Sequence, residues 1–212
     1  MVRRIGIYAF NEVEVLDLAG PYEVFTTASR LAARLSARAG LSAAAGGAFD
    51  VVTLGAEPGL VRARAGLQFK IDCLISEAPP LDLLVVPGGV IDAEFDRPRL
   101  IHWLASMPAP IVASVCTGAF LLARAGLLNG KRATTHWEDA EDLAQRFPLT
   151  VVEPDRRWID EGEIVTSAGI AAGIDMSLHL VGRLHSPELA TACARQMDYP
   201  WAAQPSQARL EV

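Results

Sequence analysis

Short apolar runs alternate along the chain with longer segments in which apolar residues recur at helical spacing. The apolar runs predict buried strands at residues 3–10, 49–56, 81–90 and 110–115. The helical spacing predicts helices at residues 20–40, 98–107, 117–126, 137–147, 171–185 and 187–197. Because strands alternate with helices, we expect an α/β fold in which a parallel central sheet carries helices on both faces.

Two segments alternate between apolar and polar positions, as antiparallel hairpins do. Residues 60–75 alternate around a central Ala-Gly pair, and residues 156–167 turn at a Glu-Gly pair. A short strand is expected at residues 132–134. No repeat, linker or shift in composition divides the chain, so we expect one domain over residues 1–201 and a loosely ordered tail over residues 202–212.

The composition is that of a folded globular protein and narrows the choice of partners. Of the 212 residues 51% are hydrophobic, and the net charge is −6. Such an acidic chain, with a pI of about 5.2 and no basic block, disfavours binding to nucleic acid through a cationic surface. We expect no nucleic-acid partner.

Cysteine usage and the amino-terminal segment bear on the compartment. The three cysteines, Cys73, Cys116 and Cys193, are too widely spaced for a disulfide framework or a zinc pattern, which favours a reducing environment. The first apolar run stops at Asn11, short of a secretory signal, and no stretch approaches the ~20 apolar residues of a membrane span. We expect a cytoplasmic protein without a membrane partner.

Cys116 lies in "ASVCTGAF", where a predicted strand meets a predicted helix. A thiol at this junction faces unpaired backbone N–H groups and the positive end of the helix, which stabilise a thiolate and lower its pKa. Alternatively, Cys116 is a small buried hydrophobic residue. Gly118, which permits a tight turn, favours a reactive cysteine over a structural one.

A Gly-Gly loop is expected at the same edge of the sheet. Gly88 and Gly89 lie in "VVPGGV", at the end of the third strand, and ligands of open α/β sheets bind where the carboxyl ends of the strands meet. The backbone N–H of Thr117, together with that of Gly88 or Gly89, is therefore a candidate oxyanion hole.

Asp17 lies in "VEVLDLAGP", after the first strand. It is either an N-cap for the helix that starts near Pro21 or a carboxyl group placed against the Cys116 sulfur. In the second case burial would raise its pKa and suit it to donate and accept a proton.

His136, in "TTHW", is the histidine expected nearest to a strand end. It begins a helix, with Thr134 or Thr135 as the cap, or it faces the site. We do not assign it as the general base.

Three of these stretches resemble one family. "VVPGGV", "ASVCTGAFLLARAGLLNGKRATTHW" and "VTSAGIAAGIDMSLHLV" look like the ThiJ/PfpI superfamily, and the resemblance extends over residues 3–201. Among its subgroups the chain is most similar to isonitrile hydratases and to the amino-terminal domains of AraC-type regulators. The resemblance implies a flavodoxin-like sandwich, a homodimer, a nucleophilic cysteine on a strained strand-to-helix elbow and no obligatory metal.

The resemblance also assigns roles to residues of this chain. Cys116 matches the nucleophile, Asp17 the acid near the sulfur, Thr117 the residue after the nucleophile and Gly89 the loop glycine that faces it. Protease-like and glyoxalase-like branches have histidine where this chain has Thr117, which puts proteolysis, amidotransfer and a Cys-His-acid mechanism in doubt. The AraC-type regulators carry helix-turn-helix units, and no basic recognition helix is found here.

The function implied by the resemblance is a cysteine-dependent hydratase or lyase that converts a small isonitrile and water to an N-substituted formamide. Cys116 would attack the substrate, Asp17 would move the proton, and Trp137 and Ile170 would border a small apolar pocket. No cofactor is implied. The alternatives are a redox sensor or ligand-binding protein with an oxidisable Cys116, and a glyoxalase-like activity on reactive carbonyls.

Overall fold

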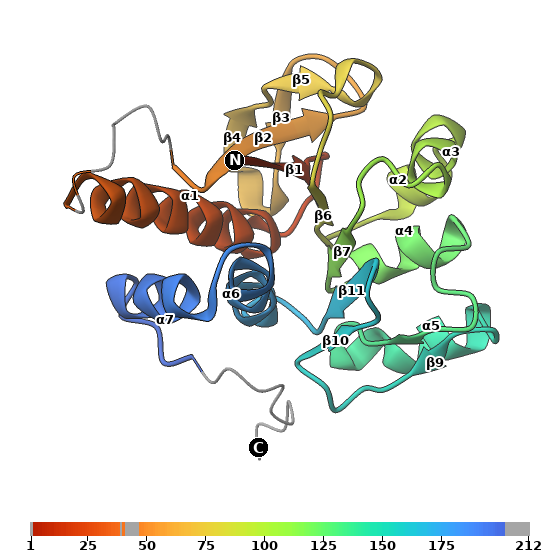
Figure 1. Ribbon diagram of the computed structural model, residues 1–212. Helices are drawn as coiled ribbons and strands as arrows, with labels where there is room; N and C mark the ends of the chain where they lie inside the picture. Colours follow the sequence, from red (N-terminus) through yellow and green to blue (C-terminus); the bar gives the residue numbers. More distant parts are fainter. Residues whose placement is uncertain (1, 39, 41–46, 202–212) are drawn as a thin grey trace.

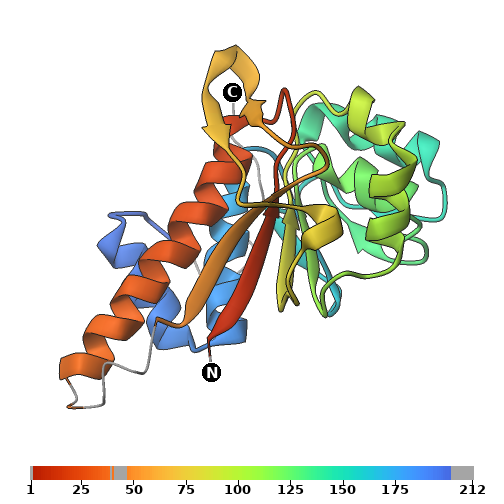
Figure 2. The ribbon, with the colours of Figure 1, turned by 90° about the horizontal axis from the view of Figure 1, so that it is seen from above.

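The computed structural model describes residues 2–38, 40 and 47–201. The predicted tail over residues 202–212 lies outside the described residues. In the described residues, helices cover both faces of one central sheet (Figures 1 and 2).

The central sheet has seven strands in the order β10-β11-β7-β6-β1-β2-β5. They are β1 (Arg3–Tyr8), β2 (Phe49–Gly55), β5 (Cys73–Leu74), β6 (Leu83–Val86), β7 (Val112–Val115), β10 (Trp158–Asp160) and β11 (Ile164–Ser167). Every neighbouring pair is parallel except β10 and β11, which form the predicted second hairpin. The strands β6 and β7 are buried along their whole length, which explains their uninterrupted apolar sequences. The predicted α/β fold is confirmed.

The helices form two layers, one on each side of the sheet (Figure 2). One layer contains α1 (Val15–Arg38), α6 (Ala172–Leu184) and α7 (Pro187–Gln196), which pack against one another. The other contains α2 (Asp92–Phe95), α3 (Pro98–Ala105), α4 (Gly118–Arg124) and α5 (Ala140–Arg146). The short helix α2 was not predicted from the sequence.

Small elements lie outside the central sheet. The strands β3 (Leu60–Arg62) and β4 (Gln68–Lys70) form the first predicted hairpin, with the 3-10 turn η1 (Arg64–Gly66) between them. The predicted short strand, β8 (Arg132–Ala133), pairs with β9 (Val151–Val152) in a separate two-stranded sheet. The described residues also form the 3-10 turns η2 (Ile75–Glu77) and η3 (Trp137–Asp139).

Helix α1 begins earlier than the sequence indicated. Pro21 favoured a helix that starts near residue 20, because proline is common in the first turn. In the structure α1 begins at Val15, and Pro21 lies inside it. Asp17 is therefore within the first turn and is not an N-cap.

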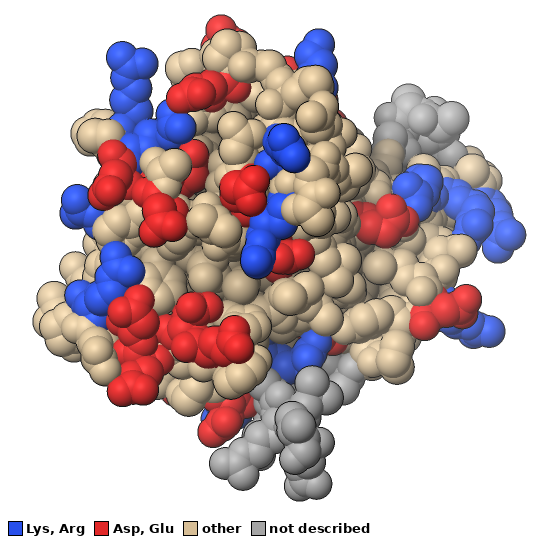
Figure 3. All heavy atoms as spheres, turned by 180° about the vertical axis from the view of Figure 1, so that it is seen from behind, with Lys and Arg blue, Asp and Glu red and all other residues tan. Residues whose placement is uncertain are grey.

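The surface carries both signs of charge. On the face shown in Figure 3, lysine and arginine side chains lie among aspartate and glutamate side chains. Within the described ranges, no helix is both long and apolar enough to cross a membrane.

Candidate active site

Cys116 occupies the turn between β7 and α4 and has a left-handed backbone, with a φ of 55°. A residue with a Cβ atom adopts this conformation at a cost of roughly 1–2 kcal/mol, so its surroundings must hold it. Its N–H lies 3.2 and 3.3 Å from the carbonyl oxygens of Ser167 and Ala168. Its own carbonyl accepts hydrogen bonds from Thr135 Oγ1 at 2.8 Å and from the Ala119 N–H at 3.2 Å. These contacts fix a strained strand-to-helix elbow.

Two glycines let the segments around the elbow approach closely. A Cβ atom at Gly118 would lie 2.2 Å from the Val86 carbonyl oxygen. A Cβ atom at Gly88 would lie 2.6 Å from the Thr117 nitrogen and 2.9 Å from Asp17 Oδ2. Gly118 is thus required for the packing of α4 against the end of β6, while the cysteine itself adopts the left-handed conformation.

Asp17 is fully buried at the start of α1. Its Oδ2 accepts a hydrogen bond from the Gly88 N–H at 2.9 Å, while Oδ1 has no hydrogen-bond partner among the described residues. Burial raises the pKa of the Asp17 carboxyl to about 7, although the Gly88 N–H, the Cys116 side chain and the Ile170 N–H favour the charged form. A carboxyl group with this pKa can exchange a proton near neutral pH.

The Cys116 thiol is held in its protonated form, so the prediction of a lowered pKa is wrong. Burial and, after it, the Asp17 carboxylate raise the pKa of the thiol to about 12. The Thr117 N–H and hydroxyl favour the thiolate but do not offset this rise. The following helix α4 is seven residues long, and its positive end does not outweigh burial beside a carboxylate. The thiol needs a base, and Asp17 is the acid beside it.

The amides predicted to form an oxyanion hole are already engaged. The Gly88 N–H donates to Asp17, and the Gly89 N–H donates to Thr117 Oγ1 at 2.9 Å. The same hydroxyl donates to the Gly89 carbonyl at 2.9 Å. The Thr117 N–H faces the Cys116 sulfur. In this structure the two glycine amides orient an acid and a threonine, and the predicted oxyanion hole is not formed.

His136 borders the site through the segment that follows β11. A Cβ atom at Gly169 would lie 2.0 Å from His136 Cδ2, so the ring packs directly on this glycine. The next residue, Ile170, has a left-handed φ of 47° and a partly exposed side chain. His136 is itself the cap of η3, because its Nδ1 accepts from the Glu138 N–H at 3.4 Å.

The structure brings two further residues to the elbow. Thr135, predicted with Thr134 as a helix cap, is instead buried and bonded to the Cys116 carbonyl. Asp139 is partly buried, and its charge contributes to raising the pKa of Cys116. The sequence did contain a sign of this role, because Thr134 and Thr135 directly follow the short strand β8. Residues in that place are typical of a buried strand end rather than of a helix cap.

A cavity of about 310 Å³ lies between α1 and the β3–β4 hairpin. Val15, Leu18 and Tyr22 of α1 line it, together with Phe69 of β4. Cys116 is not among its lining residues. In the part of the chain that the structure describes, no group of three or more His, Cys, Asp or Glu side chains is arranged to hold a metal ion.

Comparison with known proteins identifies the family of this chain. Residues 3–183 match the DJ-1/PfpI family. The chain belongs to the DJ-1/PfpI family. A related family member, an isonitrile hydratase from Pseudomonas putida, is 32% identical over 94% of this chain and 79% of its own length.

Other relatives of this DJ-1/PfpI chain are transcriptional regulators. The HTH-type regulators CdhR and GbdR of Pseudomonas aeruginosa are 34% and 32% identical, over 68% and 92% of this chain. The chain spans 43% and 50% of these two regulators, about half of their length.

Solved DJ-1/PfpI structures share the fold. A ThiJ/PfpI family protein from Pseudomonas syringae superposes with a TM-score of 0.79 at 24% identity, over 95% of this chain and 77% of that one. Drosophila melanogaster DJ-1beta superposes with a TM-score of 0.78 at 18% identity, over 95% of this chain and 100% of that one. These likenesses confirm the flavodoxin-like arrangement of sheet and helices.

Proposed function

We propose that this protein is a cysteine-dependent hydratase that converts a small isonitrile and water to an N-substituted formamide. The observation that carries the proposal is the pairing of the protonated Cys116 thiol with Asp17, a fully buried carboxyl group oriented by the Gly88 N–H. With a pKa of about 7, Asp17 can accept a proton and return it at neutral pH. The similarity to an isonitrile hydratase supports the choice of substrate.

The reaction proceeds in two stages that this pair can serve. In the first stage Asp17 takes the thiol proton and delivers it to the terminal isonitrile carbon, while the Cys116 sulfur bonds to that carbon and forms a thioimidate. In the second stage water adds to the thioimidate carbon, and Asp17 transfers a water proton to the substrate nitrogen. Collapse of the adduct breaks the carbon–sulfur bond, returns the remaining hydroxyl proton to sulfur and releases the formamide.

The hydrogen bonds around the elbow favour this chemistry over acyl transfer. A peptidase or amidotransferase stabilises an oxyanion with free N–H donors. Here the Gly88 and Gly89 amides already donate to Asp17 and Thr117. Addition to an isonitrile carbon depends first on proton delivery, which the buried carboxyl supplies. We accordingly assign Cys116 and Asp17 as the catalytic residues, with Thr117 and the two glycines positioning them.

The same geometry weighs against a redox sensor. Oxidation of a cysteine to sulfenate proceeds through the thiolate, and sensor cysteines have low pKa values and accessible sulfurs. Only 8% of Cys116 is exposed, and burial raises the pKa of its thiol. A glyoxalase-like activity is disfavoured by Thr117, which stands where the glyoxalase-like branch has histidine.

Ligand binding without turnover is the second candidate function. It is favoured by the similarity to regulators over 92% of this chain. A ligand-binding domain would retain isonitriles or related small molecules unchanged, whereas a hydratase consumes them. We further propose, from the family resemblance, a cytoplasmic homodimer that binds no nucleic acid, which light scattering and a DNA-binding titration would test.

The decisive experiment incubates the protein with aliphatic isonitriles and follows the N-substituted formamide by NMR. We expect turnover whose kcat/KM rises through about pH 7 as Asp17 ionises. Cys116→Ala protein serves as the blank, and methylglyoxal serves as the competing substrate. Formation of lactate from methylglyoxal without formamide from any isonitrile would overturn the proposal, and binding without consumption would favour the ligand-binding alternative.

A further inference from the structure

Acidic side chains border the Cys116 site on two sides. On the first side lies Glu14, whose backbone N–H donates to the Gly88 carbonyl at 2.9 Å. The Glu14 carboxylate lies 3.2 Å from Arg64 Nη1. Gly88 is the residue that bonds Asp17. The Glu14 carboxylate thus lies close enough for its charge to raise the pKa of Asp17.

On the second side, Asp139 follows the His136 cap. Its N–H donates to the His136 carbonyl at 3.0 Å, and its Oδ2 lies 3.7 Å from His136 Nδ1. The His136 ring packs on Gly169, directly after the residue whose carbonyl accepts from the Cys116 N–H. Asp139 therefore lies next to the elbow, and its charge contributes to the raised pKa of the Cys116 thiol.

The balance of charge around the two sides is negative. Arg64 is the cation on the first side, and it is already paired with Glu14. His136 lies 3.7 Å from both Glu138 Oε2 and Asp139 Oδ2 on the second side. An exposed aromatic ring, Trp137, lies beside it with its centroid 5.7 Å from that of His136, and such a ring attracts cations.

We propose that the Cys116 site selects uncharged and cationic electrophiles against anionic ones, and that Glu14 and Asp139 set this selection. The inference rests on the proposed function and names the charge class of its substrate. An anion approaching the sulfur meets the charges of Asp17 and Asp139, and Glu14 adds its charge beside Asp17. Glu14 and Asp139 are partly exposed, so this repulsion weakens as salt is added. A neutral or cationic substrate of the same size meets no such barrier.

Three methanethiosulfonate reagents measure this selection directly at Cys116. The methyl reagent is uncharged, the 2-sulfonatoethyl reagent is anionic and the 2-(trimethylammonio)ethyl reagent is cationic. In each case the thiolate attacks the reagent's sulfenyl sulfur, a disulfide forms, methanesulfinate leaves and the thiol proton passes to Asp17 or water. Rate constants are obtained by mass spectrometry of the Cys116 peptide, which separates it from Cys73 and Cys193. Each rate constant is divided by that of the same reagent with 2-mercaptoethanol.

We expect the normalised cation-to-anion ratio to be at least roughly tenfold in the natural protein and to fall with added salt. Asp139→Asn and Glu14→Gln should each lower that ratio by roughly three- to tenfold, since each removes one charge. A change in the ionisation of the Cys116 thiol alters the rates of all three reagents alike, so it cancels in the cation-to-anion ratio. The rate of the uncharged reagent measures that change. Glu188→Gln, which removes an exposed acid on α7, is the matched control and should leave the ratio unchanged.

Two outcomes overturn the inference. One is a ratio near one, or a ratio that neither Asp139→Asn nor Glu14→Gln lowers. The other is a Cys116 that none of the three reagents modifies. Labelling of Cys116 needs no turnover, so failure of this inference can be told apart from failure of the proposed function. Selective labelling without formamide production would contradict only the hydratase activity. Hydration of isonitriles together with unselective labelling would contradict only the charge selection.

Discussion

Cys116 and Cys193 are both buried and both have thiols with raised pKa values, but they differ in backbone conformation and in the groups around the sulfur. Cys116 is 8% exposed and Cys193 is 0% exposed. Burial raises the pKa of both thiols, to about 12 for Cys116 and about 11 for Cys193. Neither the exposed fraction nor the pKa of the thiol therefore distinguishes the two cysteines.

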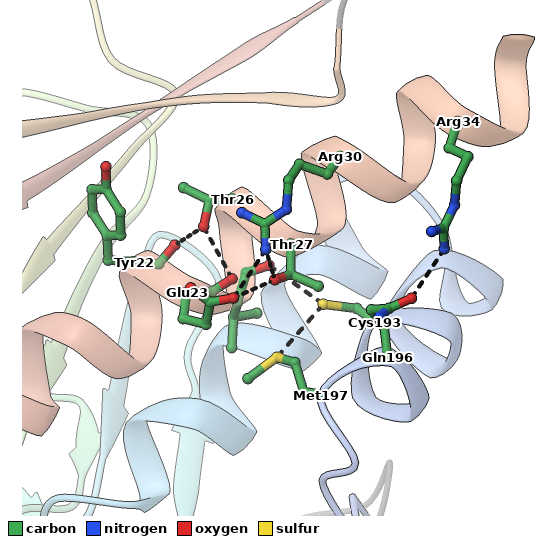
Figure 4. Close-up of polar contacts among 10 residues, drawn as sticks. Tyr22, Glu23, Thr26, Thr27, Arg30, Arg34, Cys193, Gln196 and Met197 are labelled. Carbon is green, nitrogen blue, oxygen red and sulfur yellow. Dashed lines mark hydrogen bonds and ion pairs between the residues drawn. The ribbon is translucent and has the colours of Figure 1, made fainter.

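The surroundings of Cys193 are those of a packed helix. Its thiol lies between α7 and α1, 3.4 Å from the Val24 carbonyl oxygen and 3.9 Å from Met197 Sδ (Figure 4). Arg34 donates to Gln196 across the same two helices at 3.0 Å. Cys193 lies on a regular helix, and among the described residues no carboxyl group bonds to its sulfur.

Cys116 differs in two features, a left-handed backbone and the adjoining buried acid. The first feature belongs to the turn after β7, at the edge of the sheet where open α/β folds commonly bind ligands. The second is a buried carboxyl group that can accept the thiol proton. Under the proposed function, the reactivity of Cys116 depends on its backbone conformation and on a nearby proton acceptor, which burial alone does not supply.

The largest expected effect is on turnover when each cysteine is removed. Cys116→Ala should lower isonitrile hydration by at least about 10⁴-fold, because the nucleophile is lost. Cys193→Ala should leave turnover within about twofold. Formamide production at saturating isonitrile measures both, with circular dichroism as the check on folding. A Cys193→Ala protein that folds but does not turn over would remove the contrast between the two residues.

Removal of the acid should separate proton transfer from thiol ionisation. Asp17→Asn should lower kcat/KM by about 10²–10⁴-fold, the usual contribution of a general acid–base group. The same change should lower the pKa of Cys116, because the carboxylate that opposes the thiolate is gone. The thiolate absorbance at 240 nm, followed against pH, measures this second effect in comparison with Cys116→Ala protein. An unchanged thiol titration would show that Asp17 does not act on this sulfur.

Stability should depend on pH through Asp17. Burial raises the pKa of Asp17 from 3.8 to about 7 in the folded chain, so between these values the unfolded chain has released a proton that the folded chain retains. The stabilising contribution is complete below about pH 4 and is lost as the pH rises to about 7, at about 1.4 kcal/mol per pKa unit.

The Tm of the natural protein should therefore fall by several degrees relative to that of Asp17→Asn between pH 5 and pH 8. Differential scanning calorimetry of both proteins across this range provides the measurement. Glu188→Gln, which removes a carboxyl group whose pKa is lowered, should not reproduce this trend. A constant difference between the natural protein and Asp17→Asn would contradict a raised pKa.

Thr117 should have a smaller effect than either partner of the acid–thiol pair. Thr117→Ala removes both hydrogen bonds to Gly89 and loosens the loop that orients Asp17, which we expect to lower kcat/KM by about tenfold. Thr117→Ser keeps the hydroxyl and should retain most activity. Steady-state kinetics of the two variants provide the comparison, and equal losses would show that the threonine methyl group, not its hydroxyl, is what matters.

The smallest effect tests the backbone difference alone. At position 116 glycine should be more stabilising than alanine by about 1 kcal/mol, because the φ of 55° is unstrained for glycine. At position 193, inside α7, alanine should be more stabilising than glycine by about 1 kcal/mol. Urea unfolding of the four variants gives both differences, and the same sign at the two positions would exclude a special conformation at the elbow.

The sequence was a good guide to the fold because its core strands are buried on both faces. The apolar sequences of β6 and β7 leave little ambiguity, and the helical spacing of α6 and α7 was equally clear. The start of α1 was missed because Pro21 is tolerated inside the helix. The strand β9 was missed because two residues are too few to show a periodic pattern.

For the site, the sequence predicted that Cys116 and the glycine loop meet, and it left Asp17 open between an N-cap and an acid beside the sulfur. The meeting of Cys116, Asp17 and the glycine loop follows from parallel strands that end at one edge. The sign of the thiol's pKa shift depends on how deeply it is buried and on a carboxylate distant in sequence, and neither is visible in a local motif. The same holds for the Gly88 amide, whose partner was decided by the unexpected start of α1.

The edges of the central sheet bear on how this protein behaves at high concentration. The outermost strands are β5, with two residues, and β10, with three residues. Aggregation by strand addition needs a row of unpaired backbone groups as a template, and such short edges offer very few. The folded protein is therefore poorly suited to seed amyloid-like stacking, and its aggregation on storage should follow unfolding rather than edge-to-edge contact.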